Sequence, residues 1–88
     1  MKTVTLDCAA LTTKQQLHAA LKEALSFPDW YGGNLDALYD CLTEVDTPTC
    51  LQLANWNAEL PIAPGFEETF RDAEQANTCF QVVFFRDK

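Results

Sequence analysis

The chain has 88 residues, of which 48% are hydrophobic and 11% aromatic, and 13 acidic against 6 basic side chains give it a net charge of −7. This length predicts one domain over residues 1–88, and the apolar content is sufficient for a packed core, which excludes a disordered chain. The negative charge argues against nucleic acids and anionic membranes as partners and favours either basic partners or solubility alone.

The sequence shows no targeting or membrane-spanning segment. Residues 1–7 are too polar for a signal peptide, and no apolar run approaches the roughly 18 residues that cross a bilayer. We therefore expect a cytoplasmic protein whose cysteines are reduced thiols. These are Cys8, Cys41, Cys50 and Cys79. Because no Cys-x-x-Cys pair occurs, neither a redox motif nor a zinc site is indicated, and we expect no metal and no cofactor.

The first third of the chain predicts a strand and then a helix. Residues 3–6 alternate in polarity, which is typical of a short strand. Two overlapping capping boxes in residues 12–16 place the start of the helix there. His18 shares one side of this helix with Lys14 and Lys22, which predicts a surface histidine. The predicted buried stripe consists of Leu17, Ala20, Leu21, Ala24 and Leu25.

A loop is predicted between this helix and the next. Phe27-Pro28 should end the first helix, because the residue before a proline avoids the α region. Residues 30–33 read Trp-Tyr-Gly-Gly, and glycines permit backbone angles that other residues resist. Asn34 is a favourable N-cap for a second helix.

The second helix presents two carboxylates on one face. At 100° per residue, Asp36 and Asp40 share a face with Tyr39 and Thr43. Asp36 lies in the first turn, where the helix dipole favours negative charge. Like charges four residues apart nevertheless destabilise a helix by about 0.2–0.5 kcal/mol, so stability alone does not explain the pair. The opposite face is predicted to be buried and consists of Leu35, Leu38, Cys41, Leu42 and Val45.

The second half of the chain predicts alternating strands and helices. In order, we expect a turn at 46–48, a strand at 50–53, one or two helical turns at 55–59, a chain break at Pro64-Gly65, and a helix with Phe66, Phe70 and Ala73 turned inward. Residues 79–85 are almost continuously apolar, which is typical of a strand covered on both faces. Strands separated by helices predict an α/β fold with a small parallel sheet.

Paired carboxylates suit several kinds of chemistry. They can act as general acid and base, but here both lie on a surface face without a histidine or serine constellation, so catalysis is disfavoured. A metal would need a third ligand nearby. Trp30, Tyr31 and Tyr39 flank the acidic face, and aromatic side chains are enriched at protein interfaces. Two interpretations stay open: a solvated acidic helix whose neighbouring aromatics cover the core, and a surface that binds a cation or a basic protein.

Residues 27–43 carry a more specific pattern. They read Pro28-x-x-Tyr31-Gly32-x-Asn34-Leu35-Asp36-Ala37-Leu38-x-Asp40-Cys41-Leu42-Thr43. This pattern resembles the signature of the barstar family, the intracellular inhibitors of barnase-type ribonucleases. The order of strands and helices around it agrees in outline, so the similarity covers nearly the whole chain.

The resemblance implies a small α/β fold with a three-stranded parallel sheet packed with helices, and no catalytic activity. It implies that the helix and the preceding loop plug a ribonuclease active site, with Asp40 in the place of a substrate phosphate and Asp36 paired with a second basic group. Trp30 stands where the family has a tyrosine that packs on the catalytic histidine, and Asp72 stands where a glutamate makes a peripheral contact. The expected partner-binding residues are Trp30, Tyr31, Gly32, Asn34, Asp36, Tyr39, Asp40, Thr43, Glu44 and Asp72.

Departures from the family pattern fall on or beside this surface. Tyr39 and Val45 stand where tryptophans are usual, Glu44 replaces a glycine, and Gly33 replaces a glutamate. Our hypothesis is an inhibitor, monomeric when free, of a basic, extracellular-type, guanyl-preferring microbial ribonuclease, which is a toxin of the same cell or of a competitor. The alternative is a barstar-like module that binds a basic protein without nuclease activity.

Overall fold

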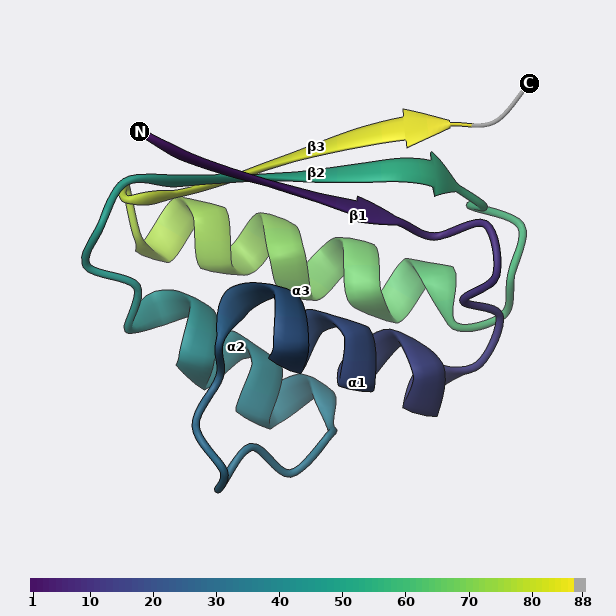
Figure 1. Ribbon diagram of the computed structural model, residues 1–88, viewed down its shortest axis with the longest axis horizontal. Coiled ribbons are helices and arrows are strands. Elements are labelled where there is room, and N and C mark those ends of the chain that lie inside the picture. Colours follow the sequence, from purple (N-terminus) through teal and green to yellow (C-terminus); the bar gives the residue numbers. More distant parts are fainter. Residues whose placement is uncertain (87–88) are drawn as a thin grey trace.

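Three parallel strands form one sheet, and the helices within residues 1–86 lie on one side of it (Figure 1). The computed structural model describes residues 1–86. The strands are β1 (Lys2–Asp7), β2 (Thr49–Trp56) and β3 (Phe80–Arg86), in the spatial order β1-β2-β3. The helices are α1 (Lys14–Leu25), α2 (Leu35–Thr43) and α3 (Ala63–Ala76). The predicted α/β class and three-stranded parallel sheet are confirmed.

The helices form in part because the sequence supplies their caps. Thr13 begins α1 with the expected capping box, in which its hydroxyl accepts a hydrogen bond from the Gln16 amide and the Gln16 side chain accepts one from the Thr13 amide. α1 ends at Leu25, before Phe27-Pro28 as predicted. α1 and α3 pack against the sheet, and α2 packs against α3.

The sheet is apolar on the face that meets the helices and open on the other. Leu51 and Leu53 of the central strand are fully buried, whereas Val83 and Phe85 of β3 are 40% and 50% exposed. The prediction that residues 79–85 are covered on both faces is therefore wrong. All described helices lie on one side (Figure 1), so an edge strand can be apolar along its length and still leave one face to solvent.

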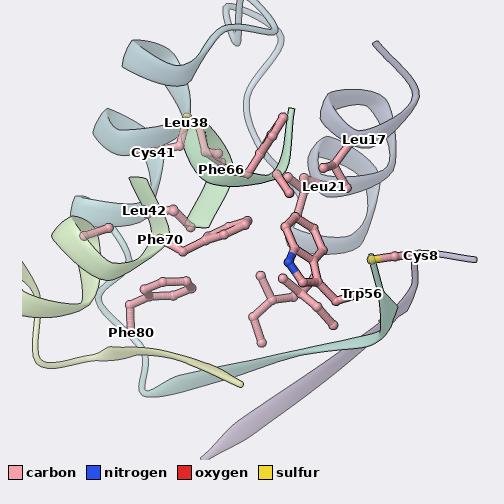
Figure 2. Packing of buried hydrophobic residues seen from close by; sticks show 14 of the residues in the cluster. Cys8, Leu17, Leu21, Leu38, Cys41, Leu42, Trp56, Phe66, Phe70 and Phe80 are labelled. Carbon is pink, nitrogen blue, oxygen red and sulfur yellow. The ribbon is translucent and has the colours of Figure 1, made fainter. Parts of the chain in front are cut away.

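The core is built around the aromatic side chains of α3 and β3 (Figure 2). The ring of Phe70 lies 6.4 Å from that of Phe80 and 6.0 Å from that of Phe84, measured between centroids. Trp56 adds its indole from β2, and its Nε1 donates a hydrogen bond of 2.8 Å to Glu67 Oε2. The one polar atom of this large buried side chain is thereby satisfied.

Two local predictions in the second half of the chain are wrong. Instead of beginning helical turns at 55–59, Asn55 and Trp56 continue β2, and residues 57–62 form turns. Asn55 has a φ of 58°, and the pairing of β2 with β3 is irregular between Leu53 and Trp56. Burial of the Trp56 ring in the core outweighs the local turn preference of the neighbouring residues.

Pro64-Gly65 does not break the chain but lies in the first turn of α3. A proline is well tolerated there, because its missing N–H would have no partner inside the helix. Gly65 also allows a close approach of α3 to α2. A Cβ atom at this position would lie 3.0 Å from Leu35 Cδ1.

The four cysteines are not paired in disulfides within the described residues 1–86. Cys8, Cys41 and Cys50 are buried, and Cys79 is half-buried. Burial, followed by the charge of Asp7, raises the pKa of the Cys8 thiol to about 11. This group is accordingly a core side chain and a poor nucleophile.

The packing predicts which phenylalanine matters for stability. Phe70→Ala should lower the free energy of unfolding by about 3–5 kcal/mol, because it leaves a cavity at a fully buried site. Phe85→Ala, on the open face, is the matched control and should cost less than about 1 kcal/mol. Equilibrium unfolding in urea measures both values, and equal losses would contradict the assignment of the covered face.

Candidate functional site

α2 separates an aliphatic face from an acidic one. Leu38 and Leu42 are completely buried and point into the core, toward the α3 phenylalanines (Figure 2). Asp36 and Asp40 are exposed, and Tyr39 is 36% exposed. The predicted division of the helix is confirmed for these residues. Thr43 is half-buried, and its hydroxyl donates a hydrogen bond of 2.9 Å to the Asp40 carbonyl.

Side chains fix α2 at both ends. At its start, Asn34 Oδ1 accepts a hydrogen bond of 2.8 Å from the Ala37 amide, as the predicted N-cap. At its end, Asn77 Nδ2 donates to the carbonyls of Leu42 and Val45, at 2.9 and 2.8 Å. The last carbonyls of a helix have no partner within it, so Asn77 satisfies two acceptors from a distant segment. Sequence reasoning missed this clamp, because an asparagine directly after α3 looks like a cap of α3 itself.

The loop between α1 and α2 is held by a buried pair. The Tyr31 hydroxyl is hydrogen-bonded with His18 Nδ1, and the two residues are 8% and 4% exposed. The Phe66 ring lies 4.8 Å from the His18 ring, between centroids. The prediction of a surface histidine is therefore wrong. The loop folds back over α1, covers the imidazole and gives it a polar partner, which the helical pattern of α1 alone cannot reveal.

Both members of this pair are neutral near pH 7. Burial, followed by the positive charge of Lys14, lowers the pKa of His18. Burial, followed by the charge of Cys41, raises the pKa of Tyr31. The unprotonated nitrogen of a neutral imidazole can accept a hydrogen bond from the phenol hydroxyl, so the pair costs little to bury.

Trp30 has the opposite environment from its neighbour. Its side chain is 58% exposed, and the loop that carries it projects beside α2 on the side away from the sheet (Figure 1). Gly33 gives the loop a left-handed residue with a φ of 69°. Trp30 and Glu44 line the same pocket, so the loop and the end of α2 form one continuous surface. We call Trp30, Asp36, Tyr39, Asp40 and Glu44 the acidic surface.

The other predicted site residues differ in position. Gly32 and Asn34 are exposed beside the acidic surface, although the Asn34 carbonyl oxygen already caps α2. Tyr31 belongs to the loop, but its side chain is hydrogen-bonded to His18 and presents little of its ring to solvent. Asp72 is exposed on α3, a separate element, so its link to the surface rests on the resemblance alone.

The sequence segment that contains α2 is rich in negative charge. Between Lys22 and Arg71 the sequence contains nine acidic residues and no lysine, arginine or histidine. The nine are Glu23, Asp29, Asp36, Asp40, Glu44, Asp46, Glu59, Glu67 and Glu68. A field of one sign attracts a partner of the opposite sign and speeds its approach.

Within residues 1–86, no three His, Cys, Asp or Glu side chains are grouped so that they could hold a metal ion. No helix in that range is both long and apolar enough to cross a bilayer.

Comparison with known proteins identifies a family and a relative of this chain. The model of the family described as Barstar (barnase inhibitor) matches residues 1–85. A Bacillus subtilis (strain 168) protein named "Putative ribonuclease inhibitor YrdF" is 47% identical over 57 residues, which are 64% of this chain and 63% of that protein. The matched region thus spans somewhat less than two thirds of the relative's length.

The buried pair predicts a pH dependence of stability. Because the folded-state pKa of His18 lies below its ordinary value of 6.5, the unfolded chain binds the proton first as the pH falls. The free energy of unfolding should therefore be larger at about pH 7.5 than at about pH 5.5, where carboxylates hardly titrate. Urea unfolding of the wild type and of His18→Gln, which cannot titrate, checks this. Equal pH dependence in both would contradict the assignment, since His18 is the single histidine.

Proposed function

The chain belongs to the barstar family, and from this premise we propose that it inhibits a ribonuclease by laying the acidic surface over the enzyme's active site. One observation carries the proposal. Asp36 and Asp40 stand exposed on a helix whose other face is buried and whose two ends are fixed by Asn34 and Asn77. The name of the Bacillus subtilis relative as a ribonuclease inhibitor supports it.

The physical basis of the proposed inhibition is that the carboxylates of Asp36 and Asp40 imitate the phosphate groups of RNA. A ribonuclease site must be cationic, because it binds the RNA backbone and stabilises the negative charge of the transition state. Two carboxylates one helical turn apart offer the same charge without a bond to cleave. Because α2 is fixed before docking, little conformational entropy is lost on binding.

The proposal gives each residue of the surface a role. Asp40 is the central anion and Asp36 pairs with a second basic group. Trp30 stands at the position of the family tyrosine that packs on the catalytic histidine, so it is assigned to the rim of the active site. Tyr31 supports the loop from below, through its bond with His18. The remaining contacts are assigned to Gly32, Asn34, Tyr39, Thr43, Glu44 and, at the periphery, Asp72.

We further propose that the target is a basic, guanyl-preferring ribonuclease of the barnase type, made by the same cell or by a competitor. The inhibitor would then act in the cytoplasm, where it protects cellular RNA as an immunity protein. An inhibitor of this kind needs no catalytic group, so the proposal assigns this chain no enzymatic role.

A second candidate function follows from the departures on the surface. Tyr39, Glu44 and Val45 differ from the family pattern while both aspartates remain. These differences favour a binding partner other than the ribonuclease that the family pattern fits. The alternative function is therefore a module that binds a basic protein without nuclease activity.

One experiment distinguishes the inhibitor of a ribonuclease from the module that binds another basic protein. The purified protein is titrated into a panel of barnase-type ribonucleases while RNA cleavage is followed continuously. We expect at least one enzyme to lose its activity at equimolar inhibitor, with an affinity that falls as salt rises, because exposed charges are screened. Inhibition of none of them, together with capture of basic proteins that do not cleave RNA, would support the alternative.

The central role of Asp40 can be tested by one substitution. Asp40→Ala should weaken inhibition by about 100-fold or more, because it leaves basic groups of the enzyme buried without a partner. Asp72→Ala, the same change at another exposed helical site, should weaken it less than about tenfold. Both variants should keep a thermal midpoint within about 3 °C of the wild type, since neither side chain is buried.

If Asp40→Ala inhibits as strongly as the wild type, α2 does not enter the active site. In that case the inhibitory surface lies elsewhere on the chain.

A further inference from the structure

A pocket of about 370 Å³ lies beside the acidic surface, between the end of α2 and the loop that follows α1. This volume is near the lower end of the roughly 300–1,000 Å³ that small ligands occupy. The pocket is lined by Phe27 and Trp30 on the loop, by Cys41 and Glu44 on α2, and by Asp46 beyond α2. We call it the Trp30 pocket.

Its loop wall is aromatic and partly open to solvent. Trp30 is 58% exposed, although a tryptophan ring is among the largest apolar groups a chain can bury. Phe27 behind it is half-buried and packs on Tyr31, with 4.9 Å between ring centroids. The wall therefore rests on the His18–Tyr31 pair and stands in place before any partner binds.

Its opposite wall is acidic. Glu44 and Asp46 are exposed, and the one basic residue of the lining is Lys2 of β1, so the pocket carries a net negative charge. The same wall is joined to the centre of the acidic surface. Cys41 lines this wall together with Glu44, and burial, followed by the charges of Glu44 and Asp40, raises the pKa of its thiol.

We propose that the Trp30 pocket receives an arginine side chain of the bound ribonuclease and so helps to decide which enzyme is inhibited. This inference rests on the proposed function. A guanidinium group stacks on an aromatic ring while its planar fork donates hydrogen bonds to carboxylates, and its aliphatic stem packs on apolar walls. Trp30, Glu44 and Asp46 supply the ring and the carboxylates within one cavity.

Other occupants fit less well. A phosphate or an acidic side chain would be repelled by Glu44 and Asp46. An apolar side chain would shield these carboxylates from water without giving them a partner, which is costly. A lysine ammonium is compact and strongly hydrated, and it stacks on tryptophan less readily than a guanidinium group.

The test uses the ribonuclease that the wild type inhibits and compares dissociation constants of three variants. Glu44→Gln should weaken binding about two- to fivefold, whereas Glu68→Gln, the same charge change on α3, should leave it within a factor of about two. Val45 also lines the pocket, so Val45→Trp should fill it and weaken binding about tenfold. Exchanging the exposed arginines of the ribonuclease one at a time for alanine should identify one that is coupled to Glu44 in a double-mutant cycle.

A second measurement needs no ribonuclease. N-acetylarginine amide, titrated at millimolar concentration into the isotopically labelled chain, should shift the Trp30 indole N–H resonance and the amides of residues 44–46, and Glu44→Gln should reduce these shifts. Absence of shifts at these positions, or equal binding of the ribonuclease by wild type, Glu44→Gln and Val45→Trp, would overturn the proposal. If the wild type inhibits no ribonuclease at all, the proposed function fails, and the shifts alone then decide whether the pocket takes a guanidinium group.

Discussion

Burial of Leu38 and Leu42 against α3 is the interaction on which the acidic surface depends. Each buried leucine side chain contributes about 1.5–3 kcal/mol, whereas two like charges one turn apart cost about 0.2–0.5 kcal/mol. The apolar face of α2 therefore outweighs the repulsion on its other face. The carboxylates of Asp36 and Asp40 are presented outward because the leucines fix the rotation of the helix, and Gly65 lets the two helices approach closely.

The sequence alone predicts those structural features that depend on residues close to one another in the chain. The spacing predicts two overlapping capping boxes in residues 12–16, the N-cap at Asn34 and the two faces of α2, and the structure forms the box at Thr13, the N-cap and both faces. Features that join distant segments could not be predicted in this way. The pattern of α1 predicts that His18 lies at the surface, because it does not indicate that a later loop places Tyr31 over this residue.

Contacts between distant segments also explain why the end of β2 and the start of α3 differ from the prediction. Turn-forming residues after Leu53 and the Pro64-Gly65 pair both suggest local breaks. The strand nevertheless continues because Trp56 reaches the core, and the helix starts early because a proline fits its first turn. The apolar composition of β3 predicts a strand, but the number of faces that helices cover is a property of the whole fold.

The clamp from Asn77 to Leu42 and Val45 has a consequence for the order of events during synthesis. The carbonyls of Leu42 and Val45 have no bond to Asn77 until this residue, more than 30 positions further along the chain, has been synthesised. A nascent chain that has reached only the end of α2 thus lacks both this clamp and the α3 surface on which the helix rests. The acidic surface therefore reaches its final support only after α3 and Asn77 have been synthesised.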